Sequence, residues 1–119
     1  MSDKKVLNRK AIPVNSVIFR EDDLASCAYL LKSGAVDITT EKDGKRVLLN
    51  TIVPNQLFGE LALIDGSRRS ATATATMPCE VIIVSQEDIE RKMNDLDDFM
   101  KYWLEYLTER VRDLSKRIG

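Results

Sequence analysis

The sequence contains no histidine, one tryptophan and only two cysteines. It also has no nucleophile-elbow pattern, no Walker lysine and no cluster of side chains at metal-ligand spacing. Enzymes that hydrolyse phosphodiesters, for example, need an activated water, which bound metal ions usually generate. Nothing in the sequence indicates residues that would hold such metal ions. The sequence therefore favours a binding protein, with no catalytic and no metal-ligating residues, over an enzyme.

Signals for secretion, membrane insertion and nucleic-acid binding are also missing. Cys27 and Cys79 lie in apolar or strand-like surroundings without a CxxC partner, which favours reduced cytoplasmic thiols over a disulfide. Residues 1–5 lack an apolar signal region, and no stretch approaches the ~18 apolar residues that span a bilayer. A formal net charge of -1 gives no general attraction to nucleic acids or acidic membranes. We therefore expect a cytoplasmic protein without membrane association or direct nucleic-acid binding.

Most of the chain is typical of a small β-rich domain. Its 119 residues, 44% hydrophobic and 31% charged, fit one domain over residues 1–119 with a single core. Asp43-Gly44 is the clearest hairpin signal. Turn residues separate short apolar or alternating segments that predict strands at 17–19, 28–31, 36–40, 47–53, 70–76 and 80–84. Many short strands indicate a barrel or sandwich over about residues 10–84.

The pattern changes to a helical one at residue 85. Ser85 and Asp88 predict the start of a short helix, and Asn94 with Asp95 is expected to end it and to cap another. The C-terminal helices are thus expected over about residues 85–118. Apolar residues at steps of three and four form a stripe along the last helix: Leu96, Met100, Trp103, Leu107, Val111, Leu114 and Ile118.

One segment combines an acid, a flexible glycine and a base. Gly59 lets the backbone approach a ligand closely, and the helix-favouring residues 60–63 would leave amides unpaired in their first turn. Such amides and the helix dipole attract an anion. Arg69 can add a forked charge for two phosphate oxygens, and Glu60 can accept a hydrogen bond from a sugar hydroxyl. These residue types predict a nucleotide pocket, to which Ser70 adds a hydroxyl.

The string FGELALIDGSRRSAT at residues 58–72 resembles the phosphate-binding cassette of cyclic nucleotide-binding domains. That family includes kinase regulatory subunits, gated channels and catabolite-activator-type regulators. Residues 15–23 and 29–36 are similar to the first strands and turns of these domains, so the resemblance covers about residues 10–118. It implies an antiparallel β-barrel or jelly roll (double-stranded β-helix), mainly β, with a short phosphate-binding helix and C-terminal helices.

The resemblance also implies a set of ligand contacts. Glu60 would hold the ribose 2′-hydroxyl, Arg69 would pair with the cyclic phosphate, and the amides of Gly59, Leu61 and Ala62 would complete the cradle. The expected ligand is cyclic AMP rather than cyclic GMP, with no other cofactor. Leu49 or Asn50 is expected to face the purine, and Ser70 can meet a guanine amino group. The full set of predicted ligand-binding residues is Leu49, Phe58, Gly59, Glu60, Leu61, Ala62, Arg69, Ser70 and Ala71.

Departures from the family pattern lead to two further expectations. Asn15, Asp22 and Asn55 stand where the family commonly has glycine, and these residue types tolerate left-handed turns best after glycine. Arg68 stands where proline is frequent. We expect Arg69 to be buried and Arg68 to point to solvent or to an acidic neighbour.

The last helix has two interpretations. Its stripe either packs on the barrel or, in part, pairs with a second subunit, and the resemblance implies a lid over the base and often a dimer seam. We expect a homodimer through this helix, with Tyr102, Trp103 and Tyr106 more readily packed at the core than in contact with the base. Ligand would act by favouring a lid-closed state.

Three alternatives remain open for the chain as a whole. It could be a regulatory fragment of a larger transcription regulator, channel or kinase. It could be a free-standing sensor, which Met1 makes at least as plausible. It could also be a dimerisation scaffold of the same fold that binds no ligand, although Glu60 and Arg69 together argue against this reading.

Overall fold

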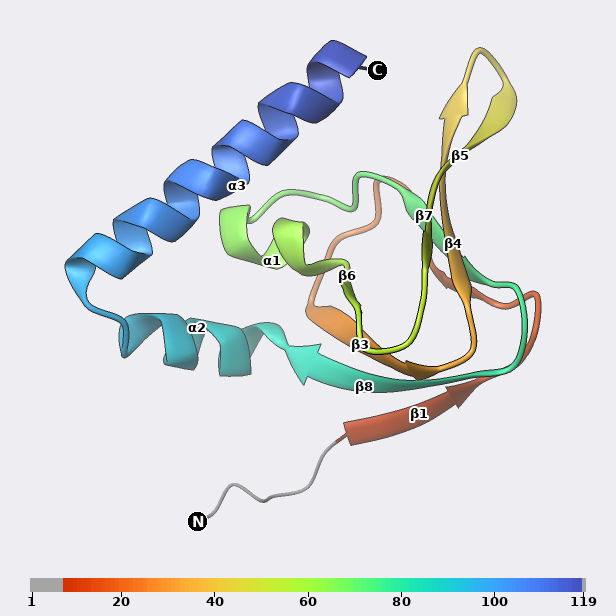
Figure 1. The fold of residues 1–119 in the computed structure, drawn as a ribbon, viewed down its shortest axis with the longest axis horizontal. Helices are drawn as coiled ribbons and strands as arrows, with labels where there is room; N and C mark the ends of the chain where they lie inside the picture. The colour runs from red at the N-terminus through yellow and green to blue at the C-terminus, as the bar shows by residue number, and fades with distance from the viewer. Residues whose placement is uncertain (1–7, 119) are drawn as a thin grey trace.

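The computed structural model describes residues 8–118, except for the side chains of residues 64, 65, 112 and 114–118. Figure 1 shows strands in two layers with three helices at one side. The strands are β1 (Asn8–Ile12), β2 (Val17–Phe19), β3 (Cys27–Ser33), β4 (Val36–Lys42), β5 (Lys45–Ile52), β6 (Leu57–Phe58), β7 (Thr72–Ala75) and β8 (Cys79–Ser85). The helices are α1 (Glu60–Asp65), α2 (Gln86–Asn94) and α3 (Asp98–Ile118).

The strands form two four-stranded sheets, with the orders β1-β8-β3-β6 and β2-β7-β4-β5. Every strand pairing is antiparallel. The predicted mainly-β jelly-roll architecture is confirmed, although hydrogen bonds divide the described strands into two sheets and do not close a barrel. We call residues 8–85 the β-sandwich.

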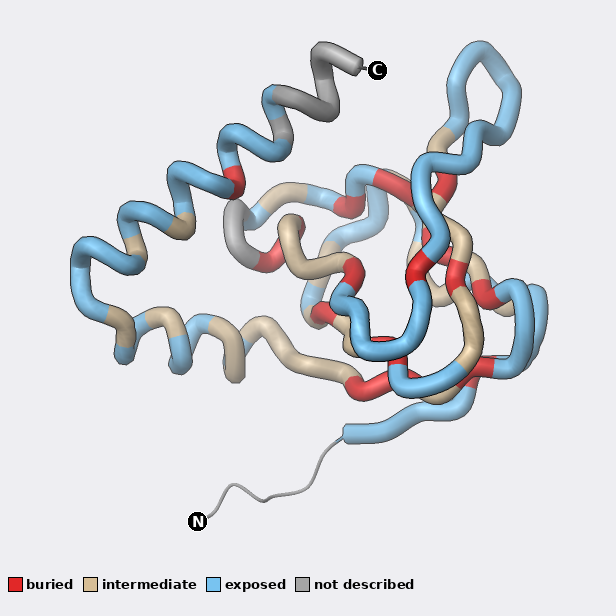
Figure 2. Tube along the Cα trace, in the orientation of Figure 1, coloured by how far each residue is buried: buried red, intermediate tan, exposed pale blue. Residues whose placement is uncertain are grey.

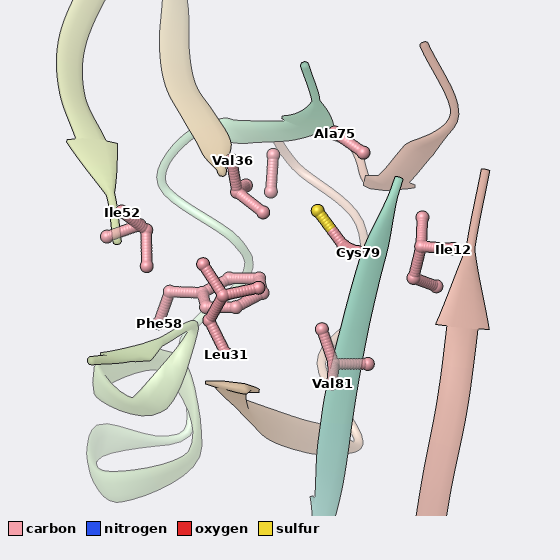
Figure 3. Close-up of a cluster of buried hydrophobic side chains, with 9 residues drawn as sticks. Ile12, Leu31, Val36, Ile52, Phe58, Ala75, Cys79 and Val81 are labelled. Carbon is pink, nitrogen blue, oxygen red and sulfur yellow. The ribbon is translucent and has the colours of Figure 1, made fainter. Parts of the chain in front are cut away.

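The core lies between the two sheets (Figure 3), and its largest fully buried side chains are Leu31, Val36 and Val81. In β7, burial follows the alternation seen in the sequence, and Ala73 and Ala75 are completely buried. The alternating threonines of β7 are only partly buried. The small residues of this segment therefore face inward, as the alternation of a half-buried strand requires.

Left-handed turns occur where the sequence predicted them. Asn15, Asp22 and Asn55 have φ angles of 69°, 73° and 75°. Asp43 and Gly44, at the tip of the β4–β5 hairpin, have φ angles of 54° and 76°. Positive φ at both central residues gives the turn a twist that matches the flanking strands.

Two strands have no counterpart in the sequence prediction. β1 is an edge strand whose side chains are exposed up to Ile12, so it shows no apolar alternation. β6 has only two residues and pairs with β3 through Leu57 and Phe58. Both strands exist because a partner strand is in place, which local propensity does not reveal.

The C-terminal helices begin partly as predicted. Ser85 caps α2, since its hydroxyl accepts a hydrogen bond from the Asp88 amide at 3.1 Å. The prediction that Asn94 or Asp95 caps the last helix is wrong. The Asp97 carboxylate takes that place and accepts a hydrogen bond from the Met100 amide at 2.9 Å, so the helix begins at Asp98.

Helix α3 runs back across α1, which it contacts. Figure 2 shows the described part of α3 mostly exposed, whereas most of the buried residues lie in the sandwich. Tyr102 and Trp103 are 70% and 47% exposed, and Tyr106 is also exposed. The expectation that these aromatic residues pack at the core is therefore wrong, because the rings lie on exposed parts of a helix whose buried described side chain is Thr108.

The apolar stripe of α3 is also largely uncovered within one chain. Met100, Leu107 and Val111 are exposed, as is Phe99, which stacks on Trp103 with ring centroids 6.1 Å apart. The side chains of Leu114 and Ile118 lie outside the described residues.

Candidate functional site

A cavity of about 330 Å³ opens beside α1, between the start of that helix and the strands of both sheets. Apolar side chains form most of its wall, and Glu60, Arg69, Ser70 and Asn50 add polar groups. The lining residues are Phe19, Ile38, Asn50, Ile52, Leu57, Phe58, Gly59, Glu60, Leu61, Ala62, Arg69, Ser70 and Ala71. A largely apolar wall with a few converging polar groups is typical of a small-molecule site.

Gly59 connects β6 to α1 at this cavity. It is the N-cap of α1 with φ 78°, and no side chain caps the helix start. A Cβ atom at this position would lie 2.6 Å from Nη1 of Arg69, so glycine is required by space as well as by backbone conformation. The backbone of Gly59 can therefore approach both the arginine and whatever occupies the cavity.

Arg69 is only 4% exposed although it carries a permanent charge. Its Nη1 donates a hydrogen bond to the Gly59 carbonyl at 2.8 Å, and its Nη2 donates one to the Cys27 carbonyl at 2.5 Å. Its Cζ lies 4.1 Å from the centroid of the Phe19 ring. Its Nε is buried without any hydrogen-bond partner.

The charge of Arg69 is not balanced by an acid. Among the described residues, ion pairs join Arg9 to Glu80 and Arg91 to Asp88, and no carboxylate lies within 4.0 Å of the Arg69 guanidinium. A buried cation without a counter-ion is costly. The cavity is therefore lined by a positive charge, which suits an anionic ligand.

The loop after β2 holds this arginine segment in place. The Asp22 amide donates to the Arg69 carbonyl at 2.8 Å, and the Arg69 amide donates to the Asp23 carbonyl at 2.9 Å. Arg68 is exposed, and its Nη1 donates to the Asp22 carbonyl at 2.9 Å. The prediction of a buried Arg69 beside an outward Arg68 is confirmed, although the partner of Arg68 is a backbone carbonyl.

Every predicted ligand-binding residue except Leu49 lines the cavity. Leu49 is 56% exposed. Ile38 pairs with Asn50 and Thr39 with Leu48, so Leu49 is the extra residue of a β-bulge and is displaced from the lining. Asn50, the alternative considered for this strand, is a lining residue. The role of each residue toward a ligand remains a prediction.

The sequence prediction missed the apolar wall of the cavity, formed by Phe19, Ile38, Ile52 and Leu57. Ile38 and Ile52 carried a usable signal, because each belongs to a segment predicted as a strand. Phe19 also lies in a segment predicted as a strand, but that segment is distant in sequence from the cassette and reaches the cavity only when β2 pairs with β7.

Three aromatic rings stack beside the arginine. Phe19 lies 5.9 Å from Tyr29 and 6.1 Å from Phe58, and Tyr29 lies 5.2 Å from Phe58, measured between ring centroids. Burial raises the pKa of Tyr29 to about 12, with a hydrogen bond to Cys27 acting in the same direction and the Arg69 charge opposing it. The stack is therefore neutral at physiological pH and leaves the guanidinium as the charge beside it.

Other kinds of site are not found in the part of the chain that the structure describes. No group of three or more histidine, cysteine, aspartate or glutamate side chains there could hold a metal ion. No helix there is long and apolar enough to cross a membrane. Cys27 and Cys79 are both free thiols.

Comparison with known proteins agrees with this geometry. Residues 9–95 match the family model of the cyclic nucleotide-binding domain. The match covers more than half of the chain, and the chain therefore belongs to the cyclic nucleotide-binding domain family, a class of regulatory modules.

Individual relatives extend the comparison. The chain is 36% identical over 81 residues to the cyclic AMP receptor protein of Thermus thermophilus, which covers 67% of this chain and 38% of that protein. It covers about half or less of the length of the curated relatives it matches.

A solved structure of the EAL enzyme Bd1971 in its cAMP-bound form is similar with a TM-score of 0.84 and 29% identity, over 93% of this chain and 30% of that one. Its cGMP-bound form is similar with a TM-score of 0.85 and 28% identity, over 92% of this chain and 30% of that one.

Proposed function

We propose that this chain is a regulatory sensor that binds a cyclic nucleotide, cyclic AMP in preference to cyclic GMP, in the cavity beside α1. The observation that carries the proposal is the buried guanidinium of Arg69, which lines the cavity without a carboxylate partner among the described residues. A cyclic phosphodiester carries one negative charge and two free oxygens, which a forked guanidinium matches.

Each polar group of the cavity has a proposed role. Arg69 pairs with the cyclic phosphate, and the backbone amides at Gly59, Leu61 and Ala62 donate to the same group. Glu60 lines the cavity at the first position of α1, where it can accept a hydrogen bond from the ribose 2′-hydroxyl. The apolar wall supplies a surface on which a purine can rest.

The preference for cyclic AMP is the finer part of the proposal. Support comes from similar proteins, which include a cyclic AMP receptor protein and a cAMP-dependent protein kinase regulatory subunit. The solved EAL enzyme is recorded with either nucleotide, so that likeness favours neither. Asn50 and Ser70 line the cavity and are the polar groups that could meet the base edge.

The output of the sensor is proposed to pass through α3, with a homodimer formed along that helix. An exposed row of large apolar side chains on a long helix favours pairing with a second apolar surface. Ligand shifts such an assembly only by binding one arrangement of α3 more tightly than another. We propose that the chain is one domain without catalytic activity, working in the cytoplasm, where free thiols are common.

Titration calorimetry with cyclic AMP and cyclic GMP tests the binding proposal. Arg69→Ala should weaken binding by ~2 to 5 kcal/mol, the range for losing one partner of a buried charged pair. Arg68→Ala is the matched control, because the adjacent arginine is exposed and lies outside the cavity. Equal affinities of native chain and Arg69→Ala would overturn the assignment, and no heat with either nucleotide would overturn the function.

The proposed role of Glu60 has its own test. Glu60→Ala should weaken binding of cyclic AMP, whereas 2′-deoxy cyclic AMP should bind the native chain and the variant alike, because it lacks the hydroxyl that the carboxylate accepts. An equal loss with both ligands would show that Glu60 acts in another way. Linear nucleotide appearing during incubation would contradict the absence of catalysis.

A further inference from the structure

We propose that Phe19 is a positioning residue for Arg69: its ring holds the guanidinium in the orientation in which a phosphate meets it. The inference rests on the proposed function and adds to it a residue outside the 58–72 segment. Phe19 ends β2, in the sheet opposite to β6, which leads into Gly59. The arginine and the ring are therefore brought together only by the folded sandwich.

The contact between the two side chains is close and specific. Cζ of Arg69 lies 4.1 Å from the Phe19 centroid, compared with 5.9 Å from the Tyr29 centroid. The pairing of β2 with β7 shifts register between Val17 and Phe19, and such irregularities change the direction of a side chain. The shift occurs at the end of β2 where Phe19 meets Arg69.

The electrostatic character of this support matters for ligand binding. An aromatic face attracts a cation through its quadrupole and carries no net charge. The Gly59 and Cys27 carbonyls, which accept hydrogen bonds from Arg69, are also neutral. A carboxylate in the same place would neutralise Arg69 and compete with a phosphate. The ring and carbonyls stabilise the buried cation and leave its full charge available.

The pose also leaves donors for a ligand. A guanidinium has five N–H donors in a fixed plane, of which the structure directs two at carbonyls. Nε is buried with almost no accessible surface and has no partner, so the donors left for a ligand are the second N–H of Nη1 and of Nη2. An arginine already held in one orientation loses less conformational freedom when an anion binds, and this pre-organisation raises affinity.

Gly59 lies close to both the guanidinium of Arg69 and the ring of Phe19. A Cβ atom there would lie 2.6 Å from Nη1 of Arg69 and 3.1 Å from Cε2 of Phe19. Glycine, guanidinium and ring thus pack as one unit, in which the ring limits movement of the arginine away from its carbonyl partners.

The test changes the electrostatics of the ring without changing its shape. Phe19 is replaced with mono-, di- and pentafluorinated phenylalanine, which progressively removes the negative face of the ring. We expect the Kd for cyclic AMP to rise with each step, by about tenfold for the pentafluorinated ring, while far-UV circular dichroism and the melting curve show a folded chain. Phe19→Tyr should bind within about twofold of the native chain, and Phe19→Leu should lose about tenfold.

A double-mutant cycle shows whether Phe19 acts through Arg69. In the Arg69→Ala background, the same replacements should leave the residual Kd unchanged, because no guanidinium remains to be positioned. An unchanged Kd across the fluorinated series, or equal losses in both backgrounds, would overturn the role of Phe19 while the proposed function stands. A native chain that binds neither cyclic nucleotide would overturn both.

Discussion

The β-sandwich and α3 differ in how much of their apolar surface the chain covers by itself. The buried hydrophobic side chains of the described residues all lie between Ile12 and Ile82, whereas the buried side chain of α3 is the polar Thr108. The sandwich encloses a buried apolar core, although Leu24, Leu48 and Leu57 on its surface are exposed, whereas α3 leaves a row of apolar residues exposed without such a core (Figure 2).

The two regions therefore differ in where their stability comes from. Burial of apolar surface is the main favourable term in folding, so the sandwich has its own source of stability. A helix within a protein gains most of its stability from packing its apolar face against other elements. Helix α3 contacts α1 but leaves a row of apolar side chains exposed, and we propose that a second copy covers them.

The largest expected effect is on the stability of the sandwich. Leu31→Ala, at a position with no exposed surface, should lower the free energy of unfolding by about 2 to 5 kcal/mol, through lost burial and a cavity. Leu107→Ala is the matched change on α3, where the leucine is 43% exposed. It should cost less than ~1 kcal/mol in a dilute sample. Urea unfolding of both variants measures the two losses in free energy of unfolding. Similar losses for the two variants would contradict the difference between the sandwich and α3.

The next effect concerns self-association. Leu107→Glu places a charge in the proposed seam and should weaken dimerisation by roughly 1 to 2 kcal/mol, a loss typical of a central interface residue. Sedimentation velocity over a concentration series measures the change. Glu105→Ala, on the same helix, should leave the association unchanged. A native chain that stays monomeric at all concentrations would contradict the dimer, without touching the site in the sandwich.

The smallest effect is a pH dependence within the sandwich. Because the pKa of Tyr29 is raised to about 12 from 10.0, the folded chain keeps this proton after the unfolded chain has released it. The contribution of Tyr29 to stability is complete below pH 10 and is lost as the pH rises through 12. Tyr29→Phe should make the alkaline fall in stability shallower, as measured by urea midpoints between pH 9 and 12. Tyr102→Phe on α3, at an exposed ring, should keep the native slope.

Local patterns predicted much of the fold and of the candidate site. The alternation of alanine and threonine located β7, and Asp43-Gly44 located the β4–β5 turn. Within the cassette, the predicted ligand-binding residues, Phe58 to Ala62 and Arg69 to Ala71, line one cavity. These features depend on neighbours in the chain, so a short window of sequence carries the information.

The predictions were least complete where distant segments decide the outcome. Leu49 or Asn50 was expected to face the purine, and of the two only Asn50 lines the cavity, because the bulge in the β4–β5 pairing displaces Leu49. Trp103 was expected at the core, but α3 runs across α1 and leaves this ring 47% exposed. The length of the helix and its apolar stripe could be predicted from the sequence. The direction in which the helix packs depends on contacts with residues that are distant in the sequence.

The amino-acid sequence by itself determined which backbone positions turn left-handed, which strand residues face inward and which acid and base belong to the candidate site. These properties follow from the conformational limits of each residue and from the two-residue period of a strand. Only the tertiary structure decided that Phe19 lies against Arg69, that no carboxylate of the described residues pairs with this guanidinium, and that the stripe of α3 is exposed. Those properties depend on which surfaces meet, and that is settled when the two sheets close on one core.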